Sequence, residues 1–202
     1  MTRTETPGRR RNAGQTREDV LVAAVAEFTA HGYATAGVRQ IAERAGVTAM
    51  MINRYFGSKE GLFEAAVERS FAPPTVVGQD EADLAGSIAS RLATRTAAGS
   101  EVLDPFLLML RSASDPVAGP IVRRGIEQHV GARLRDQLRG PDPDARAELV
   151  LAMLAGTWLM RTVLSTDGLR DVSEERLTEL LRPTLAALVE DGPTVAEGRG
   201  ER

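Results

Sequence analysis

The chain has no cysteine and only two histidines among its 202 residues. Disulfides, thiolate metal sites and cysteine nucleophiles are therefore excluded, and a transition-metal sensor site is not expected because its usual ligands are scarce. No cofactor is predicted. The lack of cysteine fits a reducing cytoplasm, which is the location we expect.

Long apolar runs are also missing. No segment approaches the roughly 20 apolar residues that a membrane-spanning helix needs. The polar, arginine-bearing residues 1–16 contain nothing like the apolar centre of a signal peptide. We therefore expect a soluble protein with no membrane partner.

The usual sequence motifs of enzymes are absent as well. There is no glycine-rich phosphate loop, no G-x-S-x-G elbow, no H-E-x-x-H pair and no carboxylate cluster with metal-ligand spacing. The paired acids Glu174 and Glu175 fall at the start of an expected helix, where they interact favourably with the helix dipole. The sequence therefore argues against an enzyme.

Basic side chains are concentrated near the N-terminus. The net charge of −3 argues against a wholly basic nucleic-acid-binding protein, so the distribution of charge matters more than its sum. Residues 1–72 carry ten basic and eight acidic side chains, whereas the remainder carries fifteen and twenty. Lys59 is the only lysine.

The N-terminal segment is predicted to be an arm followed by a helix. Residues 1–15 lack apolar periodicity and are expected to form a flexible basic arm. The first helix is expected to begin at Thr16, which resembles a capping box together with Asp19, and to end at Gly32.

Two short helices follow, joined by a glycine. The second helix is predicted over about two turns, residues 38–45, and Gly46 supplies the left-handed residue that commonly ends a helix. Thr48 is expected to cap the third helix through its hydroxyl, while Ile52 and Phe56 face inward. This pattern is typical of a helix-turn-helix, whose second helix enters the major groove of DNA.

The rest of the chain shows helical periodicity and no β-type alternation. Ser58 is expected to cap a fourth helix, which ends before Pro73 and Pro74. Further helices are predicted at 81–97, 102–114, 116–138, 144–164 and 174–190, separated by turns that include 99–100 and 167–168.

These elements predict an all-α fold with about nine helices. An N-terminal three-helix helix-turn-helix DNA-binding domain at 16–72 is followed by a C-terminal helical domain at 73–192. Residues 193–202 are predicted to be a disordered tail.

The outward face of the third helix is the candidate reading surface. It presents these side chains: Thr48, Ala49, Met50, Asn53 and Arg54. Asn53 can pair with adenine, Arg54 with guanine, and Met50 can contact a thymine methyl group. Met51 follows Met50 directly, so one of the two methionines must point away from the core. Phosphate contacts are predicted for Arg17, Arg39, Tyr55, Lys59 and the amides at helix N-termini.

The same residues resemble the DNA-binding domain of the TetR family of bacterial repressors. The motif begins with His31-Gly32-Tyr33, continues as VRQIAERAGVT at 38–48 and ends as YFGSKEGLF at 55–63, all at near-fixed spacing. The resemblance implies a homodimer that reads a palindromic double-stranded operator, and a small-molecule effector that binds the helical C-terminal half and changes operator affinity. It also implies that Thr48 caps the recognition helix and that Tyr55 and Lys59 contact phosphate.

Two departures from the family pattern stand out. Asn53 replaces a common tyrosine of the recognition helix, and Ala36 and Gly37 replace hydroxyl residues that often begin the second helix. The operator sequence can therefore not be borrowed from relatives. Arg17, Thr35 and the arginine-rich arm are the candidates to replace the phosphate contacts.

The C-terminal half matches the family only in length and helix pattern. By analogy, its last two long helices are expected to pair with their copies in a four-helix dimer interface, where Gly156 permits close approach. The candidate ligand-binding residues are Phe106, Met109, Leu110, Ile126, His129, Val130, Met153, Trp158 and Arg161. One Arg and one His in a mostly apolar cavity would suit an apolar molecule with an acidic or polar end. Each of these side chains has simple core packing as its alternative role.

The function predicted from the sequence is therefore a ligand-responsive DNA-binding regulator, most simply a repressor. The alternative is a helical ligand-binding or interaction protein with weakened DNA binding, which the substitutions at 36, 37 and 53 keep open. The effector, the regulated genes, the operator and the sign of regulation are not fixed by the sequence.

Overall fold

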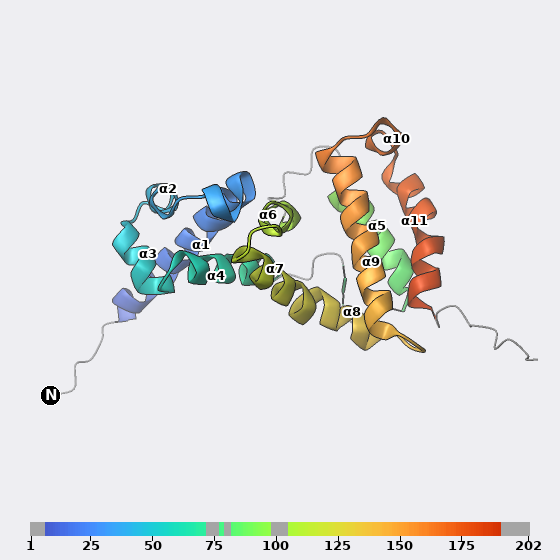
Figure 1. Ribbon diagram of the computed structural model, residues 1–202, viewed down its shortest axis with the longest axis horizontal. Coiled ribbons are helices and arrows are strands. Elements are labelled where there is room, and N and C mark those ends of the chain that lie inside the picture. Colours follow the sequence, from blue (N-terminus) through green and yellow to red (C-terminus); the bar gives the residue numbers. More distant parts are fainter. Residues whose placement is uncertain (1–6, 72–76, 79–81, 98–104, 191–202) are drawn as a thin grey trace, which may run out of the picture. The chain divides into compact units, whose positions relative to one another are not determined.

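The computed structural model describes residues 7–71, 77–78, 82–97 and 105–190, and all regular structure within these ranges is helical (Figure 1). The predicted all-α class is confirmed. The predicted tail at 193–202, residues 1–6 of the arm, the Pro73–Pro74 break and the turn at 99–100 lie outside the described residues. No helix in the described ranges is both long and apolar enough to cross a membrane.

The chain forms two compact units. The first comprises residues 1–73 and 103–126, and the second comprises residues 74–102 and 127–202. The helices of the first unit are α1 (Pro7–Thr35), α2 (Val38–Arg44), α3 (Ala49–Phe56), α4 (Lys59–Phe71), α6 (Pro105–Ser112) and α7 (Ala118–Ile126). The second unit contains α5 (Leu84–Arg95), the π-helical turn η1 (Glu127–Gly131), α8 (Ala132–Gln137), α9 (Pro143–Trp158), the π-helical turn η2 (Leu159–Val163), α10 (Asp167–Arg170) and α11 (Glu174–Val189).

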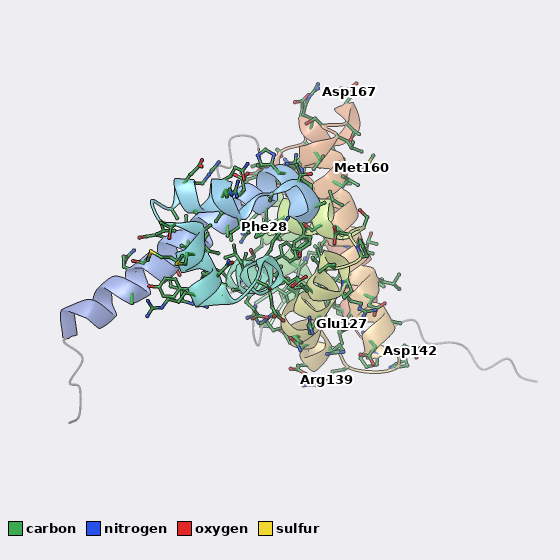
Figure 2. The ribbon with its side chains drawn as sticks, turned by 60° about the vertical axis from the view of Figure 1, so that its left-hand side comes forward. Phe28, Glu127, Arg139, Asp142, Met160 and Asp167 are labelled. Atoms are coloured by element: carbon green, nitrogen blue, oxygen red, sulfur yellow. The ribbon has the colours of Figure 1, made fainter. Side chains whose placement is uncertain are left out.

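An aromatic cluster forms the centre of the first unit. Phe28 of α1 is fully buried (Figure 2), and its ring centroid lies 5.0 Å from that of Phe63 and 6.2 Å from that of Tyr33. Helix α6 packs along α1, and α7 packs along α4. At the second of these contacts a Cβ on Gly125 would lie only 2.7 Å from Cγ1 of Val67, so the absence of a side chain allows the close approach.

The first helix departs from the sequence prediction at its start and agrees with it at its end. The start predicted at Thr16 is wrong, because α1 begins at Pro7 and so includes part of the predicted arm. Asp19 does not cap this helix, since its carboxylate accepts a hydrogen bond from Nε2 of Gln15 (2.9 Å) one turn earlier. Gly32 does end the regular helix, with φ 70° and ψ 171°.

The second unit is built around the pairing of α5 with α11, against which α9 also packs. The buried Arg146 of α9 joins these elements through backbone carbonyls. Its Nε donates to the Leu188 carbonyl near the end of α11 (2.8 Å), and its Nη1 donates to the carbonyls of Arg139 and Pro141. Figure 2 labels Arg139 and Asp142 in the turn that this arginine holds. Arg146 thereby fixes the α8–α9 turn to α11, and it pairs with no acidic side chain among the described residues.

Two predicted helices are interrupted in the structure. Residues 116–138 form α7, η1 and α8, and residues 144–164 correspond to α9 followed by η2. A π-helical turn locally shifts the register of a helix, and the hydrophobic periodicity of the sequence does not reveal such a turn. Helix α7 begins at Ala118 because Oδ1 of Asp115 accepts hydrogen bonds from the amides of Val117 (2.8 Å) and Ala118 (2.9 Å).

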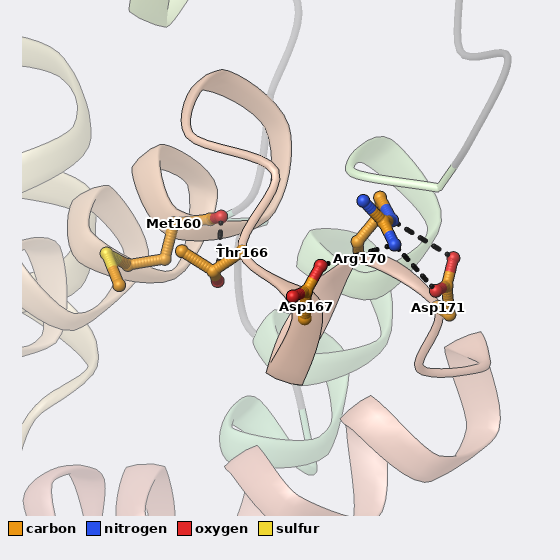
Figure 3. Close-up of polar contacts among 5 residues, drawn as sticks. All are labelled: Met160, Thr166, Asp167, Arg170 and Asp171. Atoms are coloured by element: carbon orange, nitrogen blue, oxygen red, sulfur yellow. Dashed lines mark hydrogen bonds and ion pairs between the residues drawn. The ribbon is translucent and has the colours of Figure 1, made fainter.

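A short helix also occupies the turn predicted at 167–168. Helix α10 lies between η2 and α11, and Figure 3 shows the contacts that fix it. The amide of Thr166 donates to the Met160 carbonyl (3.0 Å), while Arg170 pairs with Asp167 (3.3 Å) and with Asp171 (3.4 Å). These local polar contacts stabilise a single helical turn where the glycine alone suggested a loop.

Candidate nucleic-acid interface

Helices α2 and α3 form the predicted helix-turn-helix. Gly46 adopts φ 66° between them, so the left-handed residue expected at this position is confirmed. The amide of Gly46 donates to the Glu43 carbonyl (3.2 Å), and the amide of Val47 donates to the Ala42 carbonyl (2.9 Å). The turn thus satisfies the end of α2 through its own backbone and sets the direction in which α3 leaves.

The two faces of α3 have opposite environments. Ile52 is 0% exposed and anchors the helix in the core of the first unit, whereas Met50 is 81% exposed. Asn53 and Arg54 are also exposed, and Met51 is half-buried. The prediction that one methionine points away from the core is therefore confirmed. Side chains of three different kinds, thioether, amide and guanidinium, share the surface of one short helix.

Thr48 stands at the N-cap of α3 but does not cap it through its side chain. The predicted hydroxyl cap is wrong, because no amide of the helix donates to this hydroxyl. The extended backbone of Thr48 instead lets its carbonyl accept from the amides of Met51 (2.9 Å) and Ile52 (3.4 Å). Thr48 is an exposed residue, and the neighbouring Ala49 is half-buried. The hydroxyl is thus available for an external acceptor.

Ser58 does act as the predicted cap of α4. Its Oγ accepts a hydrogen bond from the amide of Gly61 (3.1 Å) and donates to the carboxylate of Glu60 (3.1 Å). Gly57, with φ 78°, makes the sharp corner between α3 and α4. This corner places Lys59 in the first turn of α4, one residue beyond the cap.

Lys59 lies against the C-terminal end of α1. Its Nζ donates to the Ala34 carbonyl (3.3 Å) and stands 4.7 Å from the centre of the Tyr33 ring. Burial lowers the pKa of Lys59, and the negative charge of Asp115 opposes that shift. Burial also raises the pKa of Tyr33, and the charges of Glu60 and Asp115 add to the rise. Lysine has three donors, so one bond to Ala34 leaves two for a phosphate.

Two further predicted phosphate contacts meet at the end of α3. The guanidinium of Arg17 lies 5.0 Å from the centre of the Phe56 ring, and the Tyr55 and Phe56 rings are 6.4 Å apart. The half-buried Phe56 ring therefore packs near both the Arg17 guanidinium and the Tyr55 ring. Arg17 itself is exposed and its charge stays at the surface, beside the helix predicted to read DNA.

One departure from the family pattern lies at the start of α2. Gly37 is the N-cap, and a Cβ at this position would lie 1.9 Å from Oε1 of Gln40, whose side chain fills that space. Ala36 is buried. The exposed Thr35 and Arg39 flank this helix start and remain candidates for phosphate contacts.

A buried acid that the sequence analysis overlooked joins α1 to α2. Glu27 lies next to Phe28 on the inner side of α1, and its two carboxylate oxygens approach Nη2 of Arg44 (3.4 Å) and Nε2 of His31 (3.5 Å). The sequence did contain a signal for this buried acid, namely a charged residue among the apolar positions of the first helix. This carboxylate fixes α2 against α1 and so supports the orientation of the helix-turn-helix.

The candidate ligand-binding residues fall in both compact units. Phe106, Met109 and Leu110 lie in α6 and Ile126 ends α7, all in the first unit. Met109 is buried and Leu110 is exposed. The second unit holds His129 and Val130 in η1, Met153 and Trp158 in α9, and Arg161 in η2.

Arg161 is already engaged by neutral acceptors. Its Nη1 donates to Oγ1 of Thr96 (3.2 Å) and to the Ala93 carbonyl (3.4 Å), while Nη2 donates to the Val172 carbonyl (2.6 Å). The Ala93 carbonyl belongs to the last turn of α5, where a cation is favoured by the helix dipole. This arginine therefore has a structural role in the second unit.

Comparison with known proteins agrees with this arrangement. Residues 20–66 match the tetR family of bacterial regulatory proteins, and residues 83–189 match the tetracyclin repressor-like C-terminal domain. The chain is 30% identical over 173 residues to the HTH-type transcriptional regulator BetI 2 of Chromohalobacter salexigens, an alignment that covers 79% of this chain and 83% of the relative.

Solved structures show the same fold. A TetR-family transcriptional regulator from Rhodococcus sp. superposes with a TM-score of 0.68 at 19% identity, over 87% of this chain and 99% of that one. The multidrug binding protein EbrR, complexed with malachite green, superposes with a TM-score of 0.61 at 26% identity, over 86% of this chain and 97% of that one. The chain therefore belongs to the TetR family of DNA-binding, ligand-responsive transcriptional regulators.

Proposed function

We propose that this regulator is a repressor that binds a palindromic operator as a homodimer through α3, and that a small, mostly apolar effector releases it. The observation that carries the proposal is the polarity of α3, which is anchored by the buried Ile52 and leaves Met50, Asn53 and Arg54 on the surface. A helix of this kind can lie in a major groove with its outer side chains at the base edges.

Each outward side chain suits a different base. Asn53 can bond adenine in two places, Arg54 can bond guanine in two places, and Met50 offers an apolar surface to a thymine methyl group. Phosphate contacts from Lys59, Arg17 and their neighbours would fix the register of the helix without reading sequence. Base selectivity and backbone affinity are therefore assigned to separate groups.

Exposed apolar residues on the second unit support a dimer built from α9 and α11. Leu149 on α9 is 55% exposed and Leu180 on α11 is 49% exposed, and the two helices pack against each other. A Cβ on Gly156 would meet no atom of the described residues within 4 Å, which leaves room for a partner helix along α9. Two-fold contacts of this kind are the commonest in homo-oligomers and match the symmetry of a palindrome.

The effector proposal rests on the family, whose C-terminal domain matches residues 83–189, while the nine candidate residues stay a sequence prediction. EbrR, a relative at 26% identity, was crystallised with malachite green, which supports a small-molecule site in the C-terminal half of this chain. Trp158 is the only tryptophan, so its fluorescence during a small-molecule screen reports binding near α9. A compound that changes this fluorescence and leaves operator affinity unchanged would contradict its role as effector, because coupling between sites is reciprocal.

The decisive experiment for DNA binding is a titration of the protein onto fragments from its own upstream region at physiological salt. We expect one fragment to bind at least about a thousandfold more tightly than random DNA of equal length. Equal affinity for all fragments would contradict the repressor proposal and favour a ligand-binding or interaction protein that has weakened DNA binding.

A further inference from the structure

The end of α1 is completed by two side chains of α6. At Gly32 the backbone turns out of the helix, so the carbonyls of the preceding turn need donors from elsewhere. Nη1 of Arg111 supplies them, donating to the Thr29 carbonyl (2.7 Å) and to the Ala30 carbonyl. The guanidinium also places a positive charge at the negative end of the helix.

Ser112 satisfies the amide on the other side of the turn. The amide of Tyr33, the first residue beyond Gly32, donates to Oγ of Ser112 (3.1 Å), and Ser112 is fully buried. A Cβ on Gly32 would lie 2.8 Å from the Arg111 carbonyl oxygen, so the backbones of α1 and α6 are in direct contact. Two consecutive residues of α6 thus cap the end of α1 on both sides of one turn.

The same turn carries the surface on which Lys59 rests. Tyr33 and Ala34 follow Gly32 directly, and they provide the ring and the carbonyl that hold the Lys59 ammonium. A shift of this turn by about an ångström would break the hydrogen bond, since at 3.3 Å it is already near its limit, and would weaken the contact with the ring. The side chains of α6 are therefore connected to the Lys59 ammonium through a single hydrogen-bonded turn at the end of α1.

We propose that Arg111 and Ser112 are positioning residues for DNA binding: by capping α1 they hold Tyr33 and Ala34, and through them the Lys59 ammonium, in the geometry that contacts the DNA backbone. The proposal rests on the phosphate contact proposed for Lys59. It assigns these residues of α6, which lie within the C-terminal family match at 83–189, to the DNA-binding unit.

The test uses the full-length chain and the DNA fragment that the wild type prefers. Affinity is measured against salt concentration for Arg111→Ala, Arg111→Gln, Ser112→Ala, Lys59→Gln and the double variants with Lys59→Gln. Arg124→Ala is the matched control, because it removes an equal charge from α7 of the same unit, where Arg124 pairs with Glu64 of α4 (3.6 Å) and has no hydrogen bond or ion pair with the end of α1 among the described residues. Because Lys59 is the only lysine, carbon-13 labelling of lysine gives one side-chain signal whose pKa is followed by NMR.

We expect Arg111→Ala to weaken binding about tenfold and to flatten the salt slope by up to about 0.9 for each protomer. The pKa of Lys59 should rise toward 10.5 in this variant as the side chain leaves its partly buried position. Ser112→Ala should act in the same direction, and Arg111→Gln, which keeps one donor for a carbonyl, should restore part of the loss. In the Lys59→Gln background Arg111→Ala should cost less than about twofold, because the contact it positions is already gone.

A full tenfold effect of Arg111→Ala in the Lys59→Gln background would overturn the proposal, as would an unchanged pKa of Lys59. If Arg111→Ala lost its far-UV circular dichroism, Arg111→Gln and Ser112→Ala would decide by the same two criteria. Failure of the wild type to prefer any DNA would contradict the proposed function instead, and the NMR titration would still decide whether α6 positions Lys59.

Discussion

Ile52 and Met50 lie two residues apart in α3 but differ greatly in solvent exposure, which is 0% for Ile52 and 81% for Met50. Ile52→Ala removes three buried carbon atoms at about 0.8 kcal/mol each. The cavity left behind raises the cost, so we expect the free energy of unfolding to fall by about 3 kcal/mol. Met50→Ala removes almost no buried surface and should change that free energy by less than about 0.5 kcal/mol.

The order of the effects should reverse when base preference in DNA binding is measured, with the substitution of Met50 having the larger effect. Met50→Ala should lower the preference for one base position in each half-site by about 1 kcal/mol, because its thioether is available to a thymine methyl group. Ile52→Val keeps most of the buried volume, should cost only about 1 kcal/mol of stability, and should leave base preference unchanged.

Urea denaturation followed by circular dichroism, and DNA titration with single-base variants of the preferred site, measure the two quantities separately. The reasoning would be refuted if Met50→Ala destabilised the protein as much as Ile52→Ala. It would also be refuted if Met50→Ala left discrimination at every base position intact, since an exposed apolar side chain would then have no role in reading.

Three further predictions concern other side chains. Asn53→Ala should relax preference at one base position per half-site by roughly 1–3 kcal/mol, whereas Lys59→Ala should weaken all sequences alike and flatten the salt dependence of binding; identical profiles for the two variants would refute this division. Ser58→Ala should cost about 1 kcal/mol of stability through loss of its cap, and Thr48→Ala less than about 0.5 kcal/mol because its hydroxyl caps nothing; thermal unfolding of both variants checks this, and equal losses would contradict it. Leu180→Glu should shift the protein from dimer to monomer in sedimentation velocity at micromolar concentration, and an unchanged dimer would place the interface elsewhere.

The helix-turn-helix could be predicted from the sequence because its signals are local. Gly46 and Gly57 have no side chain to oppose a positive φ, and Ile52 repeats the core spacing of a short helix. Such features depend on neighbours within a few residues. The same holds for Ser58, whose hydroxyl caps the amide of a residue three positions later.

Features that depend on distant residues were missed. The buried Glu27 pairs with Arg44 of the next helix, and the packing of α6 on α1 involves side chains about 80 positions apart. The hydroxyl of Thr48 has the right type and place for a cap, yet the extended backbone before α3 satisfies the helix through its carbonyl instead. The π-helical turns η1 and η2 change the helical register within otherwise periodic segments, so periodicity alone predicts one continuous helix in each segment.

The central claim is that the outward face of α3 reads a palindromic operator, and selection of bound sites from random double-stranded DNA tests it most directly. The wild type should enrich two inverted half-sites with centres about 10 base pairs apart or a multiple of that spacing, and Asn53→Ala should enrich the same palindrome with one position per half-site relaxed. Enrichment of no palindrome by the wild type, or an identical consensus from Asn53→Ala, would contradict the claim.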